Sequence, residues 1–294
     1  MEGIPQVMSV AGRSGRFFSL IMASFVILLL MDTVGFGADL GVIDARSLSR
    51  DAAVWVVLDG RPKAQWQAGH IPGSRSFSWE NYTRTDAKGV QFKVLAPREL
   101  ADTLGALGIS ERTPVVVYGD ADSSWGGEGW VVWLLKWLGH KGDIRLLNGG
   151  IQAWRAANLP LRSGAESYIG PRLKYQVALQ PQLDISTGEL RKLLRKVTVV
   201  DTRSTWERLR GRIPGAVAIS WEDFFSGTER RPISPAAVKK LLAKHGIDSR
   251  KQVVYYCTGG IRSGYAWMVH ELAGLPSARN YEGGMEEWKK LDSP

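Results

Sequence analysis

Cysteine and histidine are scarce in this chain. Its 294 residues include one Cys and four His. A single cysteine excludes an intramolecular disulfide, and the four histidines are scattered without the spacing of a metal site. We therefore expect neither a bound metal nor another cofactor.

Acidic side chains are outnumbered as well. Asp and Glu number 29 against 38 Lys and Arg, which gives a formal net charge of +9. A basic balance can attract nucleic acid or small anions. The basic residues are dispersed, however, and no basic tract is interleaved with aromatic residues. We therefore expect a solvated charged surface and no nucleic-acid partner.

One long apolar run lies near the N-terminus. Arg13 and Arg16 precede the run at 17–31, and small residues follow at 35–38. This order is typical of a secretory signal peptide at residues 1–37. The run is shorter than the roughly 20 residues of a membrane-spanning helix, but an uncleaved anchor or a buried helix stays open. We expect an exported protein, periplasmic or secreted, with a membrane contact only if this segment is retained.

The remaining sequence contains an internal repeat. Three segments of the first copy return in the same order in the second, which indicates duplication rather than chance. The matched segments are 59–61 (DGR) with 201–203 (DTR), 71–73 (IPG) with 213–215 (IPG), and 149–154 (GGIQAW) with 283–288 (GGMEEW).

Each copy also predicts the same order of elements. An apolar strand ends at Asp59 or Asp201, and an amphipathic helix begins at Pro97 or Pro235, the latter with Ser234 as a suitable N-cap. Apolar strands that alternate with helices indicate a parallel sheet covered on both faces. We therefore expect an α/β protein with two tandem domains. Their predicted bounds are 38–162 and 184–294, with a Gly- and Pro-containing linker at 163–183.

The single cysteine, Cys257, directly follows an apolar strand of the second copy. Gly259, Gly260 and Arg262 come next, and residues 264–273 are predicted to form a helix. Backbone N–H groups of a helix start and of a curled loop would point at one spot, and the helix dipole and Arg262 add positive charge. Such surroundings favour a thiolate at neutral pH and would stabilise a persulfide anion. A buried structural cysteine is the alternative.

With the strand-end DxR, the GHIPG turn at 69–73, the repeated GG segments and the loop from Cys257 to Arg262, the chain resembles tandem-domain rhodaneses. That family comprises sulfurtransferases of the thiosulfate and 3-mercaptopyruvate types. The resemblance implies two rhodanese-like domains, of which the second is catalytic and the first inactive. Gly119, which stands where the second copy has Cys257, agrees with this.

The resemblance also implies a double displacement. Cys257 would take sulfane sulfur from a small anionic donor, thiosulfate or 3-mercaptopyruvate, and carry it as a persulfide. The acceptor would be cyanide, a thiol or a sulfur carrier. Thiosulfate sulfurtransferase activity is thus the expectation. The family loops read Cys-Arg-Lys-Gly-Val-Thr or Cys-Gly-Ser-Gly-Val-Thr, whereas this chain has Cys-Thr-Gly-Gly-Ile-Arg, so the donor stays open.

The predicted site residues lie mostly in one loop. Cys257 is the expected nucleophile, backbone N–H groups of the loop would hold the persulfide, and Arg262 would orient the donor's sulfonate or carboxylate. Arg208 is the nearest match to a donor-contacting arginine that the resemblance implies. The predicted substrate-binding residues are Thr258, Gly259, Gly260, Ile261, Arg262, Ser263 and Arg208.

We also predict roles for residues outside this loop. Asp201 and Arg203 are expected to form a structural ion pair, and His70 is expected to be structural. Trp125 or Glu128 of the first domain could approach the site.

Two other functions stay open. A phosphatase or arsenate reductase on the same fold would place its arginine six residues after the cysteine, whereas Arg262 is five after Cys257. The chain could also be a non-enzymatic, exported sulfur-binding or partner-binding module.

Overall fold

The computed structural model describes residues 39–292. The predicted signal peptide or anchor at 1–37 lies outside the described residues, so its cleavage and the export of the protein stay predictions. Within the described range, no helix is long and apolar enough to cross a membrane.

The first copy forms a five-stranded parallel sheet with the strand order β1-β7-β6-β2-β3. Its strands are β1 (Leu40–Ile43), β2 (Val56–Asp59), β3 (Arg75–Ser76), β6 (Val115–Tyr118) and β7 (Ile144–Leu147). Its helices are α1 (Ala45–Arg50), α2 (Lys63–Ala68), α3 (Pro97–Ala106), α4 (Gly127–Trp137) and α5 (Gly150–Ala156).

The second copy forms a four-stranded parallel sheet with the order β13-β12-β8-β9. Its strands are β8 (Thr198–Asp201), β9 (Val217–Ala218), β12 (Val253–Tyr256) and β13 (Arg279–Tyr281). Its helices are α6 (Thr187–Leu193), α7 (Thr205–Leu209), α8 (Pro235–Lys244), α9 (Ile261–Leu272) and α10 (Gly284–Asp292). At the place of β1, this copy has only a parallel bridge from Asp184 to Asn280.

Short elements complete both copies. The antiparallel ribbons are β4 (Thr83–Arg84) with β5 (Lys93–Val94), and β10 (Phe225–Ser226) with β11 (Arg231–Pro232). The 3-10 turns are η1 (Ala52–Val54), η2 (Trp79–Asn81), η3 (Pro181–Leu183) and η4 (Trp221–Phe224). The same order of turn and ribbon follows β3 in the first copy and β9 in the second.

Helices cover both faces of each sheet, as the uninterrupted apolar strands predict. Successive residues of a strand point to opposite faces. In β6, Val115 and Val117 belong to one buried cluster with residues of α3 and α4, whereas Val116 belongs to another with residues of α1 and α5. In β12, Tyr255 joins α8 and α9, whereas Val254 joins α6 and α10. The predicted α/β architecture with two similar halves is thereby confirmed.

The strand-end Asp and Arg form the same buried contact in both copies. Arg61 donates to Asp59 at 2.6 Å and to the carbonyl of Gly69 at 2.8 Å. Arg203 donates to Asp201 at 2.6 Å and to the carbonyl of Gly211 at 2.8 Å. Each guanidinium therefore ties a strand end to the loop that leads to the next strand, and the ion pair predicted for Asp201 and Arg203 is present. His70 is buried against the ring of Trp66, as expected of a structural residue.

Residues 163–183 carry no helix or strand before η3 and lie along the first copy. Leu173 donates its N–H to Gly105, and Ala178 donates to Leu138. One hydrophobic cluster includes residues of both copies, and the described residues all belong to one compact unit that spans 37–294. The domain bounds at 162 and 184 stay predictions.

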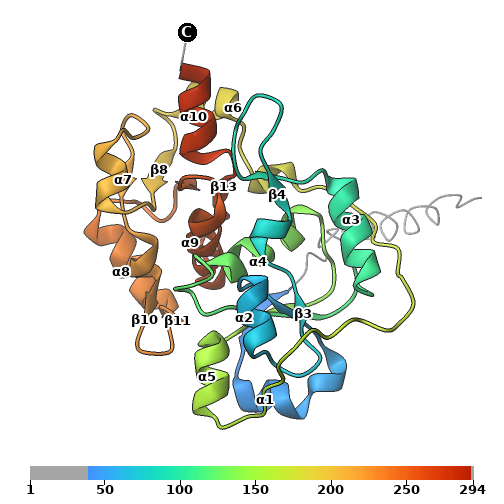
Figure 1. The fold of residues 1–294 in the computed structure, drawn as a ribbon. Coiled ribbons are helices and arrows are strands. Elements are labelled where there is room, and N and C mark those ends of the chain that lie inside the picture. Colours follow the sequence, from blue (N-terminus) through green and yellow to red (C-terminus); the bar gives the residue numbers. More distant parts are fainter. Residues whose placement is uncertain (1–38, 293–294) are drawn as a thin grey trace, which may run out of the picture. The chain divides into compact units, whose positions relative to one another are not determined.

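Helices α4 and α9 join the two copies (Figure 1). Glycines allow their backbones to approach closely. A Cβ atom on Gly129 of α4 would overlap the backbone of Tyr265, and one on Gly264 of α9 would lie 3.0 Å from the Cα of Trp130. Any larger residue at either position would push the helices apart.

We expect Gly129→Ala to destabilise the protein by about 1–3 kcal/mol, because overpacking outweighs the better helix propensity of alanine. Gly188 of α6 has open space around it, so Gly188→Ala should instead be neutral or stabilise by up to about 1 kcal/mol. Urea unfolding of both variants measures the two effects. Equal stability of Gly129→Ala and the wild type would contradict the close crossing.

Candidate active site

Cys257 lies at the carboxyl end of β12, where open α/β sheets carry their ligand sites. The residue is 1% exposed. Its carbonyl accepts a hydrogen bond from the N–H of Met285 at 2.9 Å. Its Sγ lies 3.6 Å from the Oγ of Ser263, which donates to Asn280 at 2.6 Å. The thiol is therefore held at the base of a loop that several elements fix.

The two glycines let the loop pass between close neighbours. A Cβ atom on Gly259 would lie 2.5 Å from the Cβ of Phe92, and Gly260 adopts φ +84° beside the backbone of Glu282. This turn brings the chain into α9 at Ile261, so the predicted helix start at residue 264 was wrong. Ile261, Arg262 and Ser263 belong to the first helical turn, where N–H groups have no partner within the helix.

Arg262 is paired with a carboxylate that the sequence interpretation did not identify. Its two terminal nitrogens donate to the two oxygens of Glu207 at 2.6 and 2.7 Å. Thr258 donates its hydroxyl to Glu207 at 2.7 Å and accepts a bond from Arg262 at 2.9 Å. Glu207 is also the N3 residue of a capping box with Ser204 at the start of α7. That Ser-x-x-Glu spacing was the available sequence signal.

The pairing fixes the charges of both groups. Burial alone would raise the pKa of Glu207, but hydrogen bonds from Arg262 and Thr258 outweigh it and hold the pKa below its usual value. Burial alone would lower the pKa of Arg262, but the hydrogen bonds to Glu207 and the charge of that carboxylate raise it. Both groups are therefore ionised at neutral pH, and the cation beside Cys257 has a fixed counterion.

Arg208 is directed away from the site. Its guanidinium donates to the carbonyl of Arg203 and, at 2.9 Å, to the hydroxyl of Thr205. It does not line the cavity at Cys257. The geometry therefore gives no support to the predicted contact between Arg208 and the donor.

A cavity of about 280 Å³ opens beside Cys257. Three of its walls are aromatic rings of the first copy, and the rest belongs to the second. The lining residues are Trp79, Phe92, Trp125, Glu207, Cys257, Thr258, Gly259, Ile261 and Arg262. The expected approach of Trp125 is thus observed. Trp79 lies in a Ser-Trp-Glu segment at 78–80 that recurs at 220–222, whereas no local sequence pattern marked Phe92.

In the first copy, Glu128 lies beside Gly119, the counterpart of Cys257, and does not reach Cys257 itself. Its carboxylate accepts bonds from the N–H of Ala121 at 3.0 Å and the hydroxyl of Ser124 at 2.7 Å. A Cβ atom on Gly119 would overlap this carboxylate. Ile151 donates to the carbonyl of Gly119 as Met285 does to Cys257. The first copy therefore keeps the loop framework but fills it with its own side chain.

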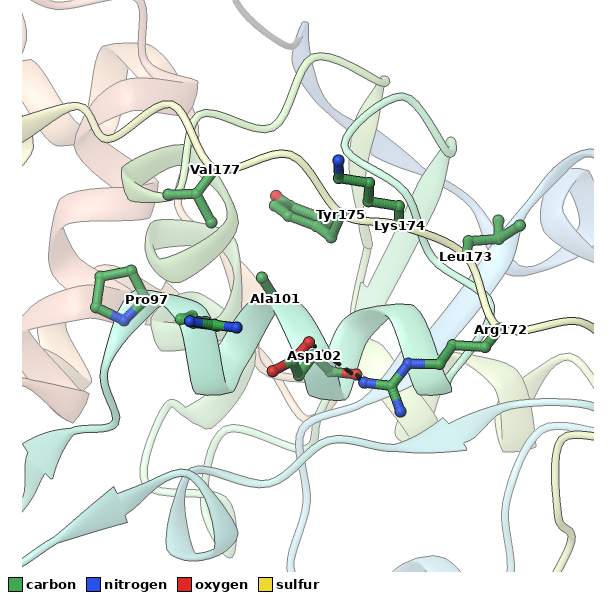
Figure 2. A pocket seen from close by; sticks show the side chains of 9 residues that line it. Pro97, Ala101, Asp102, Arg172, Leu173, Lys174, Tyr175 and Val177 are labelled. Carbon is green, nitrogen blue, oxygen red and sulfur yellow. Dashed lines mark hydrogen bonds and ion pairs between the residues drawn. The ribbon is translucent and has the colours of Figure 1, made fainter.

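A larger cavity of about 690 Å³ lies between α3 and residues 172–177. Figure 2 shows Arg172 of this cavity paired with Asp102, at 3.3 Å. Its lining contains neither Cys nor His, so size alone does not make it the reactive site. Among residues 39–292, no group of His, Cys, Asp or Glu side chains is arranged to hold a metal ion.

Fold and site together define a tandem α/β protein in which one copy carries a cysteine in the loop after its strand and the other has only the framework of that loop. Comparison with known proteins identifies the family. The Rhodanese-like domain family matches residues 43–157 and 186–291. The chain therefore belongs to the rhodanese-like family of sulfurtransferases, and the resemblance seen in the sequence is confirmed.

Individual relatives agree with this membership. The chain is 32% identical over 251 residues to the sulfur carrier protein TtuD of Thermus thermophilus, with 77% of this chain and 84% of the relative covered. It is 29% identical over 256 residues to human 3-mercaptopyruvate sulfurtransferase, with 81% and 83% covered. Other relatives at 27–32% identity are named thiosulfate or 3-mercaptopyruvate sulfurtransferases. Sulfur transfer is therefore the general activity of this family.

A solved structure shares the fold. The anaerobic ergothioneine biosynthesis enzyme from Chlorobium limicola, in complex with trimethyl histidine, superimposes with a TM-score of 0.75 at 23% identity. The match covers 86% of this chain and 69% of that enzyme. At this identity the likeness concerns the fold alone.

Glu128 predicts a pH dependence of stability. Burial raises its pKa to about 7, above the unfolded value of 4.5. Between these values the unfolded chain releases a proton that the folded protein keeps, so stability falls as pH rises, by up to about 1 kcal/mol per pH unit. Glu128→Gln should flatten this part of a plot of unfolding free energy against pH. Parallel curves for the variant and the wild type would show that Glu128 titrates normally.

Proposed function

We propose that this chain transfers sulfane sulfur through a persulfide on Cys257. The observation that carries this proposal is the position of Cys257 at a strand end, facing the first turn of α9 and a cavity of about 280 Å³. A thiolate there would attack the sulfane sulfur of a small anionic donor such as thiosulfate or 3-mercaptopyruvate. A bond forms between Sγ and that sulfur, and the bond between that sulfur and the rest of the donor breaks.

The surroundings of Sγ suit the resulting anion. First-turn N–H groups of a helix attract negative charge, and the guanidinium of Arg262, which Glu207 and Thr258 hold in place, borders the same cavity. Cyanide, a thiol or a sulfur carrier would then take the terminal sulfur and regenerate the thiolate, which is covalent catalysis in two half-reactions. We also propose that this occurs in an exported compartment, on the basis of the signal-like residues 1–37.

A non-enzymatic carrier is the second candidate. A relative at 32% identity is named a sulfur carrier protein, and Cys257 is 1% exposed, which would protect a stored persulfide. In that case the chain would load with sulfur but release it to one partner and not to small acceptors. The two candidates share the first half-reaction and differ in the second.

Intact-mass analysis after exposure to thiosulfate or 3-mercaptopyruvate tests the shared step. We expect wild type to gain about one sulfur atom and Cys257→Ser to gain none. Added cyanide should remove the sulfur as thiocyanate over many turnovers if the chain is an enzyme, and at most once if it is a carrier.

Arg208→Ala provides a matched control, because Arg208 does not line the cavity. Its turnover with either donor should stay within about twofold of wild type. A loss of turnover comparable to that of Cys257→Ser would instead support the contact between Arg208 and the donor that the family resemblance implies. Absence of mass gain with every donor would refute the persulfide itself.

A further inference from the structure

Among the residues that the structure describes, two charged side chains line the cavity at Cys257. Their charges neutralise one another. They are Glu207 and Arg262, joined by bonds of 2.6 and 2.7 Å between both guanidinium tips and both carboxylate oxygens. Such a two-point pair satisfies the strongest donors of the guanidinium. Arg262 also lies 5.7 Å from the ring centre of Trp125 and is largely buried. A donor entering the cavity therefore meets a cation that is already neutralised.

Three aromatic rings also line the cavity. Trp79 and Phe92 form an edge-to-face pair with their ring centres 5.8 Å apart, and Trp125 stands beside them at the cavity. Trp125 is 53% exposed, so much of its indole face has no contact within the chain. An exposed large ring at a cavity that contains a nucleophile is available for contact with a ligand.

The backbone holds two of these rings in unfavourable conformations. Phe92 has φ +64° and Trp125 has φ +55°, in the left-handed region that bulky residues rarely adopt. Strain of this kind persists where the surrounding structure enforces it and is concentrated at functional sites. Phe92 packs directly on Gly259 of the cysteine loop. Strained backbone in the first copy therefore holds aromatic surface against the loop of the second.

These features favour a particular kind of donor. An inorganic dianion such as thiosulfate must give up hydration on entry, and among the described lining residues no uncompensated cation offsets that cost. A donor with a flat aromatic body loses less hydration and gains stacking and apolar burial against the three rings. The neutralised charge and the aromatic lining of the cavity thus select in the same direction.

We propose that Glu207 determines donor specificity. By neutralising Arg262 it makes the cavity an aromatic receptor, which selects a monoanionic sulfur donor with an aromatic body over inorganic thiosulfate. This inference rests on the proposed persulfide chemistry of Cys257 and assigns the cysteine-free copy, through Trp79, Phe92 and Trp125, the binding of the donor's organic part.

An aryl thiosulfonate represents this class of donor. Its terminal sulfur is attacked by the Cys257 thiolate, so that a new bond joins Sγ to that sulfur. The bond between the two donor sulfurs breaks, and its electron pair leaves with the aryl sulfinate. One thiolate and one monoanionic donor become one persulfide anion and one sulfinate anion, with no external oxidant or reductant. Cyanide then removes the terminal sulfur as thiocyanate and restores the thiolate.

Three donors separate the effects of ring and charge. Benzenethiosulfonate and methanethiosulfonate share the reacting group and the charge, and thiosulfate adds a second negative charge. The readout is kcat/KM for thiocyanate formation with each donor. Trp125→Ala should lower the ratio of benzenethiosulfonate to methanethiosulfonate by about tenfold relative to wild type, which corresponds to about 1.4 kcal/mol of lost contact. Comparison of ratios cancels the different intrinsic reactivities of the donors.

Trp206→Ala is the control for loss of an exposed indole. Trp206 is 79% exposed on α7 and does not line the cavity. Its ratio of the two thiosulfonates should equal that of the wild type. If the ratio in Trp125→Ala also equals that of the wild type, the aromatic part of the proposal is overturned.

Glu207→Gln tests the role of the counterion. Glutamine can retain the capping box with Ser204, while the charge of Arg262 becomes uncompensated. We expect kcat/KM for thiosulfate to rise about tenfold, with a steeper dependence on salt, and the preference for benzenethiosulfonate over thiosulfate to fall. Glu222→Gln, at an exposed position outside the cavity, makes the same change in net charge and should alter neither value.

The outcomes separate the two proposals. If no donor adds sulfur to wild-type Cys257, the proposed function fails. If Cys257 is loaded but Glu207→Gln lowers kcat/KM for all three donors alike, Glu207 only supports the loop and the specificity proposal is overturned. Should Glu207→Gln fail to fold, the Trp125→Ala ratio still decides whether the rings bind the donor.

Discussion

The close crossing of α4 and α9 is the contact on which the site depends. Gly129 and Gly264 let the two helix backbones meet where any side chain would separate them. Tyr265 and Trp130, which lie against these glycines, belong to the one hydrophobic cluster that both copies share. Because α4 follows the loop that carries Trp125, and α9 follows the loop that carries Cys257, this crossing also sets the distance between the aromatic wall and the thiol.

Each copy has a carboxylate near the loop that follows its strand end, and the two carboxylates have different partners. In the first copy, Glu128 occupies the space beside Gly119 and accepts bonds that could otherwise hold an anion. In the second, Glu207 stays outside the loop and binds Arg262. The space beside Cys257 is therefore left open, whereas the space beside Gly119 is filled. The second copy therefore carries Cys257, and the first contributes Trp79, Phe92 and Trp125 to the cavity beside it.

Local patterns predicted much of the fold. The DxR ends gave the equivalent buried contacts of Arg61 and Arg203, and Pro97 and Pro235 begin α3 and α8 as expected. The errors have local causes. Gly260 turns the chain at positive φ, so α9 begins at Ile261 rather than at residue 264. Strand β1 is a four-residue edge strand with only one neighbour, β7, and its sequence carried too little signal to be identified.

The sequence by itself determined the repeated α/β plan, the single cysteine and the loop that carries it, because each depends on residues close together along the chain. It also supplied the family, since the repeated motifs keep their order. Only the tertiary structure decided that Arg262 is paired with Glu207, that Arg208 is directed elsewhere, and that Phe92 and Trp125 face Cys257. The pair of Arg262 and Glu207 joins two segments of the second copy that are 55 residues apart in sequence. Phe92 and Trp125 reach the cavity at Cys257 only because the two copies pack together.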